Sequence, residues 1–265
     1  TLETSDKISS LAEYDLVRKM RASFLVLGPL LTRNGYAKVS LPGGCAIGLR
    51  PVDLHVFAMK KLGSEIQLQD GYVIARANKG RLIGNKITFP QVSVGATENT
   101  IIASVFARGE TLIQNAAMEP EVQDLCNCLV SMGVEIDGIG TSSISIQGVN
   151  SLDKISYSVI SDRIEACSFI IAAAITKSQL NIKNVNPDHI NSFLIVMEDM
   201  GLKFKVSEKK IEVFESGDLN PISLKTSAYP GFPTDMQAQI VTLACLSNGN
   251  SEIQENIFEN RFMHI

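Results

Sequence analysis

The sequence predicts an α/β fold built from a repeated unit of about 70 residues. Three observations support this prediction. Segments of helical period alternate with short β-rich stretches, glycines recur at a regular interval, and one helix in each unit is apolar nearly all round. We expect an inside-out α/β barrel, with helices inside and sheets outside, arranged as two domains around a cleft. The domains are expected at residues 1–158 and 159–265.

The first helix of each unit is expected to end near a small residue and to lead into a short strand. These helical segments fall at 21–35, 96–109, 164–178 and 236–249. The last three end points, Gly109, Ser178 and Gly249, lie 69 and 71 residues apart. β-rich stretches follow them at 111–113, 179–182 and 251–253. The regular spacing indicates an internal repeat.

The second helix of each unit is expected to end at a glycine and to precede two paired strands. Gly63, Gly133 and Gly201 are spaced 70 and 68 residues apart. Alternating apolar residues follow at 135–136 with 143–146, and at 203–206 with 210–214. The unit is therefore interpreted as helix, strand, helix, strand, strand, with a further strand ahead of it.

The segment 166–175 is apolar nearly all round, which predicts a fully buried helix. Three such helices side by side, with sheets outside them, would form the interior of each domain. The pattern begins mid-unit at Leu11 and stops at Ile265. Two domains of three units need on the order of 420 residues, so we expect both ends to be incomplete.

The composition is that of an ordinary globular protein, with 45% apolar and 20% charged residues. A net charge of -4 argues against a nucleic-acid surface. The longest apolar runs are too short to cross a bilayer, and the chain opens without a signal pattern. The five cysteines lack metal-ligand spacing, and Cys126 and Cys128 are interpreted as packing residues. We therefore expect a cytoplasmic protein that contacts neither nucleic acid nor membrane.

Residues 41–51 contain three glycines and two prolines, which predict an ordered but movable loop. Cys45 lies in the middle of this loop. Arg50 follows five residues later, close enough to favour a thiolate or to hold an anion beside it. A cysteine in a glycine-rich turn is also a common space-filler, so the spacing alone leaves both interpretations open.

Six separated blocks of sequence, in one order along residues 11–265, match a known family. The blocks are 19–23, 42–45 with 50–55, 92–97, 162–165, 232–237 and 258–264. Together they resemble the enolpyruvyl transferases that act on UDP-N-acetylglucosamine. The resemblance implies transfer of the enolpyruvyl group of phosphoenolpyruvate to the sugar 3'-hydroxyl, with release of phosphate. This is the first committed step of peptidoglycan synthesis, on which cell shape and division depend.

The resemblance implies two catalytic residues and no metal or cofactor. Cys45 would protonate C3 of phosphoenolpyruvate, and a thiol suits this role because its pKa lies near neutrality. Asp235 would accept the hydroxyl proton. The structural alternative for Asp235 is that it caps the apolar helix that follows it. The resemblance also implies that an epoxide phosphonate of the fosfomycin type alkylates Cys45.

The resemblance also implies the substrate-binding residues. Arginines would bind the phosphate and carboxylate of phosphoenolpyruvate, because the guanidinium forms two parallel hydrogen bonds. A backbone segment would hold uracil, a helix N-terminus would meet the diphosphate, and apolar side chains would line the sugar pocket. In that order, these residues are Arg21, Arg50 and Arg261; Pro51, Val52, Asp53 and Leu54; Ser93, Val94 and Gly95; Ile257 and Phe258.

The sequence departs from the family pattern at position 91, where Gln91 replaces an expected lysine. An N-terminal lysine-asparagine pair and a late arginine have no counterpart, so we expect the 265-residue chain alone to be inactive. Three alternatives remain: the related shikimate-pathway transferase, a non-catalytic repeat module, and a degenerate regulatory paralogue. The cysteine loop argues against the first, and the matching catalytic blocks argue against the other two.

Overall fold

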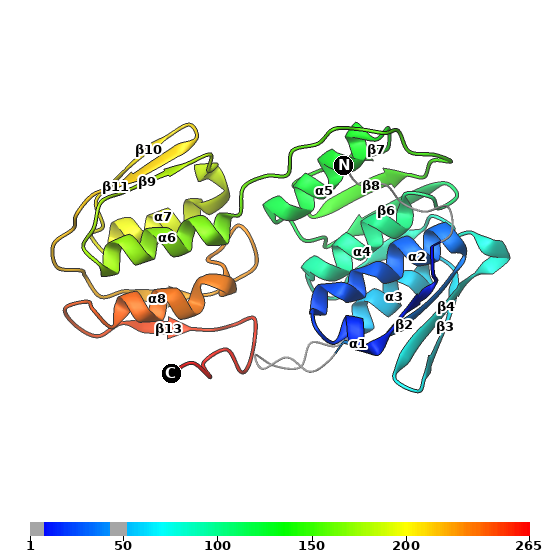
Figure 1. The fold of residues 1–265 in the computed structure, drawn as a ribbon, viewed down its shortest axis with the longest axis horizontal. Coiled ribbons are helices and arrows are strands. Elements are labelled where there is room, and N and C mark those ends of the chain that lie inside the picture. Colours follow the sequence, from blue (N-terminus) through cyan, green and yellow to red (C-terminus); the bar gives the residue numbers. More distant parts are fainter. Residues whose placement is uncertain (1–7, 43–51) are drawn as a thin grey trace. The chain divides into compact units, whose positions relative to one another are not determined.

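The structure, a computed structural model, describes residues 8–42 and 52–265 and divides into two compact units (Figure 1). The described residues up to Ser158 form unit 1, and residues 159–265 form unit 2. Each unit has its own buried apolar cluster, which includes Leu27 and Ile101 in unit 1 and Ile170 and Phe193 in unit 2. Each unit therefore has a core of its own.

The first sheet of unit 1 has the strand order β1-β2-β4-β3. The β1–β2 pair is parallel and the other pairs are antiparallel. Val73 and Ala75 alternate along β4 with no exposed surface, which marks the face that packs against helices. The elements of this part are β1 (Leu11–Ala12), α1 (Tyr14–Val17), η1 (Arg21–Val26), α2 (Leu27–Asn34), β2 (Tyr36–Ser40), α3 (Asp53–Lys61), β3 (Ser64–Gln69) and β4 (Tyr72–Ala77).

The second sheet of unit 1 has the corresponding order, β5-β6-β8-β7, again with one parallel pair followed by antiparallel pairs. Ile144 and Ile146 of β8 are buried, and the residues that alternate with them are exposed or only partly covered. The elements are η2 (Asn78–Gly80), β5 (Lys86–Thr88), α4 (Val94–Ser104), β6 (Glu110–Gln114), α5 (Pro120–Ser131), β7 (Glu135–Asp137) and β8 (Ser143–Gln147).

Unit 2 contains a three-stranded antiparallel sheet, β10-β11-β9, and a parallel pair, β12-β13. Ile211 of the central strand is completely buried and belongs to the same apolar cluster as Ile170 of α6. The elements are α6 (Arg163–Ile175), β9 (Leu180–Lys183), η3 (Pro187–Ile190), α7 (Asn191–Asp199), β10 (Phe204–Ser207), β11 (Lys210–Val213), β12 (Ser223–Lys225), η4 (Thr234–Met236), α8 (Gln237–Ala244) and β13 (Glu252–Gln254).

The glycines spaced about 70 residues apart each follow a helix in the left-handed backbone region. Gly63, Gly133 and Gly201 have φ angles of 85°, 94° and 85° and follow α3, α5 and α7. Glycine adopts this conformation at little cost because it has no Cβ. The helix-end interpretation of these glycines, and the strand pairs predicted behind them, are therefore confirmed.

Two expectations from the sequence hold only in part. The further strand expected ahead of each unit is present as β1, β5 and β12, but residues 148–162 contain no strand ahead of α6. There the Val149 and Asp153 N–H groups donate instead to the backbone carbonyls of Val105 and Met132, at 2.8 and 3.0 Å. Helix α6 is also not buried all round. Phe169 is 54% exposed, because α6 packs against β9, β11 and α8 and these leave the Phe169 side uncovered.

Helices α2 and α4 lie side by side in unit 1 and come closest at Gly28 (Figure 1). The Gly28 N–H donates to Asn99 Oδ1 at 2.7 Å. A Cβ at position 28 would overlap the Asn99 side chain and would lie 2.6 Å from the Asn99 backbone oxygen. Glycine is therefore needed at this position for the helices to pack at this distance.

We predict that Gly28→Ala destabilises unit 1 by about 2–3 kcal/mol, because the added methyl must push α2 away from α4. Urea unfolding followed by circular dichroism measures this change in the free energy of unfolding. Gly217→Ala is the control, because a Cβ there meets no atom within 4 Å. Equal stability of the two variants would show that the helices tolerate a wider spacing.

Candidate functional site

The predicted uracil-binding segment lies at the start of α3. Val52 is the N-cap residue, Asp53 begins the helix, and Leu54 is 7% exposed, which leaves mainly its backbone to face a ligand. The Asp53 carboxylate in the first turn favours the helix electrostatically. Val52 and Asp53 border a hollow of about 640 Å³, whose lining includes one basic side chain, Lys60. The sequence analysis did not single out Lys60.

The predicted diphosphate-binding segment forms the N-terminus of α4. Ser93 is the N-cap residue, and its hydroxyl accepts a hydrogen bond from the Ala96 N–H at 3.4 Å. Val94 and Gly95 are half-buried and occupy the first two helical positions. Backbone N–H groups at these positions have no acceptor within the helix, and they favour an anion.

His55 and Asn99 bring these two segments together. His55 follows Leu54 on α3, and its Nδ1 lies 3.0 Å from Asn99 Nδ2 on α4. A Cβ at Gly95 would lie 3.3 Å from the His55 ring, so the first turns of α3 and α4 lie close together. His55 belongs to a family-matching block, but neither residue was assigned a role from the sequence.

Four predicted residues cannot be placed completely. Cys45, Arg50 and Pro51 lie outside the described residues. Arg21 begins η1, and only its backbone is described.

A group of three carboxylates lies near α4 and α5. Burial, followed by the negative charges of Glu121 and Glu119, raises the pKa of Glu98 to about 7. Glu98 therefore keeps its proton to a higher pH than an ordinary glutamate does. No periodicity or motif in the sequence predicted this, because Glu98 on α4 meets Glu119 and Glu121 only through the packing of α4 against α5.

We predict that Glu98→Gln makes unit 1 more stable at pH 8 by about 1–3 kcal/mol and changes its stability little at pH 4.5. Because the pKa of Glu98 is raised in the folded protein, its contribution to the free energy of unfolding is fully present below pH 4.5, its ordinary pKa. That contribution is lost as the pH rises towards 7. Urea unfolding between pH 4.5 and 8 measures this slope. Glu135→Gln, at an exposed position on β7, is the control. A slope that persists in Glu98→Gln would contradict the assignment.

In unit 2 the predicted base and the predicted cleft arginine form an ion pair. Arg261 Nη2 donates to Asp235 Oδ1 at 3.0 Å. The Arg261 side chain is 16% exposed and its guanidinium lies 5.5 Å from the centre of the Phe258 ring, whereas the Asp235 side chain is 55% exposed. The arginine is thus shielded by an aromatic ring, and the carboxylate faces solvent.

Glu255 connects this pair to the predicted sugar pocket. Its Oε1 accepts hydrogen bonds from the Ile257 and Phe258 N–H groups at 2.7 and 3.0 Å. Its Oε2 accepts from Thr234 Oγ1 at 3.0 Å, next to Asp235. Four of the predicted side chains therefore share one local scaffold. Glu255 was not predicted from the sequence. A carboxylate that accepts hydrogen bonds from the backbone N–H groups two and three residues further along the chain is nevertheless a recurrent local pattern.

The capping alternative for Asp235 is wrong. The N-cap residues of η4 and α8 are Pro233 and Met236, and neither helix has a side-chain cap. Asp235 lies within η4, where its carboxylate points to Arg261 instead. The acidic residue that does cap a helix is Asp162, which accepts from the Ile164 and Glu165 N–H groups of α6.

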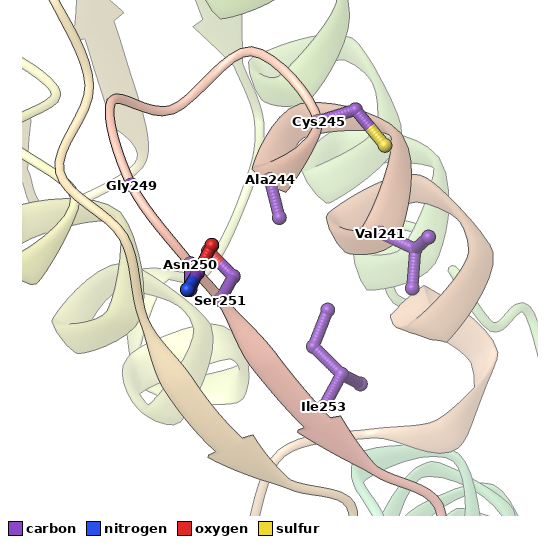
Figure 2. A pocket seen from close by; sticks show the side chains of 7 residues that line it. All are labelled: Val241, Ala244, Cys245, Gly249, Asn250, Ser251 and Ile253. Carbon is purple, nitrogen blue, oxygen red and sulfur yellow. The ribbon is translucent and has the colours of Figure 1, made fainter.

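A second hollow, of about 330 Å³, lies between α8 and β13 (Figure 2). Val241 and Ala244 of α8 line one side together with Cys245, the C-cap residue of that helix, and Ile253 of β13 lines the other. None of the predicted site residues that the structure describes borders it.

The remaining chemistry-bearing groups are packed away or scattered. Burial raises the pKa of the Cys126 and Cys167 thiols to about 12, which agrees with a packing role for Cys126. Within residues 8–42 and 52–265, no cluster of three His, Cys, Asp or Glu side chains could hold a metal ion. In the same ranges, no helix combines the length and apolarity needed to cross a membrane.

Comparison with known proteins identifies the family. Residues 2–265 match the family model described as EPSP synthase (3-phosphoshikimate 1-carboxyvinyltransferase). The chain belongs to this family. The EPSP synthase family membership agrees with the resemblance found in the sequence blocks.

Relatives within the EPSP synthase family carry a more specific name. A protein of Rickettsia akari (strain Hartford) is 53% identical over 254 residues, 96% of this chain and 60% of its own length. A protein of Rickettsia conorii (strain ATCC VR-613 / Malish 7) is 52% identical over 264 residues, 100% of this chain and 63% of its own length. Both are named UDP-N-acetylglucosamine 1-carboxyvinyltransferase, which confirms the resemblance. The chain spans less than two thirds of these relatives.

Solved structures of the family share the fold. The enolpyruvyl transferase NikO from Streptomyces tendae superposes with a TM-score of 0.79 at 21% identity, covering 96% of this chain and 61% of NikO. EPSP synthase from Acinetobacter baumannii gives a TM-score of 0.64 at 18% identity, covering 88% of this chain and 54% of that protein. The α/β class with mixed sheets is therefore confirmed.

Proposed function

We propose that this protein transfers the enolpyruvyl group of phosphoenolpyruvate to the 3'-hydroxyl of UDP-N-acetylglucosamine and releases phosphate. The main support for this proposal is the 52–53% sequence identity to relatives named for this reaction, over at least 96% of the chain. The reaction is the first committed step of peptidoglycan synthesis, in the cytoplasm, and needs no metal or cofactor. Its partners are the two small-molecule substrates.

The proposed chemistry is an addition followed by an elimination. Asp235 accepts the proton of the sugar hydroxyl as the hydroxyl oxygen bonds to C2 of phosphoenolpyruvate, and Cys45 donates a proton to C3. Loss of a C3 proton and departure of phosphate then restore the double bond. The solvent-facing Asp235 carboxylate supports the base assignment, because Arg261 orients it at 3.0 Å without covering it.

The proposed binding residues are those that the family resemblance implies, and the local geometry of the described ones supports them. Amide groups of Val94 and Gly95 at the start of α4 suit the diphosphate, and the adjacent start of α3 suits uridine. Ile257, which is 42% exposed, and Phe258 suit the sugar. We assign phosphoenolpyruvate to the three arginines, Arg21, Arg50 and Arg261, because paired N–H groups match phosphate and carboxylate oxygens.

We also propose that the two units are domains of an inside-out barrel, with boundaries at 1–158 and 159–265, around a substrate cleft. The two sheets of unit 1 support this proposal, because both have one parallel outer pair followed by antiparallel strands in the same order. The order helix, strand, helix, strand, strand also occurs three times along the chain.

The competing acceptor is shikimate 3-phosphate, which the description of the matching family model favours. We predict phosphate release from phosphoenolpyruvate with UDP-N-acetylglucosamine and none with shikimate 3-phosphate. The assay uses the chain joined at both ends to the flanking segments of the Rickettsia conorii relative, because the resemblance places further phosphoenolpyruvate-binding residues there.

In the same assay, Asp235→Asn should lower kcat about a hundredfold or more, because the amide cannot accept the hydroxyl proton. Asp199→Asn, at an exposed position ending α7, should leave kcat unchanged. Phosphate release with shikimate 3-phosphate alone would overturn the assignment of the acceptor. Full activity of Asp235→Asn would overturn the assignment of Asp235 as the base.

A further inference from the structure

Glu255 is the first residue after β13, where the chain is tied to the end of β12. The Asn256 N–H donates to Thr226 Oγ1 at 2.9 Å, and Asn256 Nδ2 donates to the Thr226 carbonyl oxygen at 3.3 Å. The Thr226 N–H in turn donates to the Gln254 carbonyl oxygen at 2.9 Å. Thr226 is completely buried. The backbone on both sides of Glu255 is therefore held in place by a buried residue of β12's end.

The half-buried Glu255 carboxylate accepts three hydrogen bonds from two different segments. Oε1 accepts from the Ile257 and Phe258 N–H groups at 2.7 and 3.0 Å, and Oε2 accepts from Thr234 Oγ1 at 3.0 Å. Each oxygen thus serves one segment. Oε1 holds the backbone that follows β13, and Oε2 holds the first residue of η4. A carboxylate suits this arrangement because both of its oxygens are acceptors.

Two contacts consequently connect η4 to the segment 255–261. The first is the hydrogen bond between Thr234 and Glu255, whose side chains are both partly buried. The second is the ion pair of Asp235 with Arg261 at 3.0 Å. The Asp235 carboxylate is exposed, and an exposed ion pair restrains its partners weakly. The Thr234 bond therefore holds the start of η4, and the ion pair orients the carboxylate that η4 carries.

We propose that Glu255 is a positioning residue for the proposed base: its carboxylate keeps η4 and the predicted sugar-pocket residues 257–258 at a fixed separation, so that Asp235 meets the sugar hydroxyl. The proposal rests on the proposed function for the reaction, whereas the hydrogen bonds of Glu255 do not. A general base must lie within hydrogen-bond reach of its proton, and a displacement of about 1 Å lowers a rate about a hundredfold. The separation that Glu255 sets is of this kind.

The first experiment measures hydrogen exchange of the Ile257 and Phe258 amides in the chain itself, by NMR. We expect both amides to exchange slowly, because Glu255 Oε1 accepts from them. Glu255→Met, which is similar in size but lacks the carboxylate, should speed their exchange about tenfold, the effect of losing roughly one hydrogen bond. Thr234→Val should leave both amides slow, because it removes the donor to Oε2 alone.

The second experiment measures phosphate release by the chain with both flanking segments restored. Thr234→Val should lower kcat about tenfold and leave KM for UDP-N-acetylglucosamine unchanged, because it releases η4 but not residues 257–258. Thr234→Ser keeps the hydroxyl and should restore kcat. Thr242→Val is the matched control, because it removes an exposed hydroxyl on α8 that donates to the Ala238 carbonyl. Its kinetics should match wild type.

Variants of Glu255 separate positioning from proton transfer. Glu255→Met should lower kcat and raise KM together, because it releases both segments. Glu255→Gln keeps an oxygen for the two N–H groups and gains an amide that can donate to the Thr234 hydroxyl, so it should retain kcat within about threefold. In the Glu255→Met background, Thr234→Val should cause no further loss, because its hydroxyl has already lost its partner.

Each outcome decides one of the two proposals. A loss of kcat in Glu255→Gln as large as in Asp235→Asn overturns the positioning role, because Glu255 would then act through its charge. Equal kcat in Thr234→Val and Thr242→Val overturns it as well. Fast exchange of the 257–258 amides in the wild-type chain removes the contact itself, even if Glu255→Met fails to fold. Slow exchange without phosphate release from phosphoenolpyruvate and UDP-N-acetylglucosamine refutes the proposed function, and the catalytic role of Glu255 with it, while its hydrogen bonds stand.

Discussion

The hydrogen bond from the Gly28 N–H to Asn99 Oδ1 determines how the interior of unit 1 is built. It lets α2 and α4 approach to a distance that excludes any side chain at position 28. A buried amide is costly unless its groups are paired, and here the backbone and His55 pair both ends of it. The requirement to satisfy one polar side chain thus fixes the relative placement of α3 and α4, whose first turns carry the candidate binding residues.

Unit 2 uses charge rather than burial to arrange its candidate residues. The Asp235–Arg261 pair has one exposed partner, so it contributes at most about 1 kcal/mol to stability. The pair instead orients the Asp235 carboxylate, because the Arg261 guanidinium that it contacts is itself packed against the Phe258 ring. Glu255 adds the backbone of 257–258 to the same arrangement through two N–H groups. The carboxylate that the proposed reaction needs is therefore held ready while remaining accessible.

Much of the secondary structure could be predicted from the sequence, because local signals determine it. Gly133 marks the end of a helix through a backbone angle that glycine adopts easily, and the alternation at 143–146 marks a strand. Where tertiary contacts decide, the prediction failed. The strand expected ahead of α6 is absent because the N–H groups of residues 149 and 153 donate to the Val105 and Met132 carbonyls. Phe169 is exposed because its neighbours cover only part of α6.

In the candidate site, too, the sequence predicted individual residues but not the tertiary contacts between them. Family-matching blocks predicted roles for Asp235 and Ser93, but the sequence could not show that Asp235 pairs with Arg261 or that the Asn99 amide lies against His55. Those partners are 26 and 44 residues apart, and no periodicity connects them.

The proposed nucleotide-sugar site at the adjoining starts of α3 and α4 can be tested by recording backbone amide chemical shifts as UDP-N-acetylglucosamine is added to the chain. We expect the largest changes to cluster at 52–55 and 93–96, and shikimate 3-phosphate to leave those amides unchanged. Changes centred on the hollow between α8 and β13, or equal changes with both compounds, would contradict it.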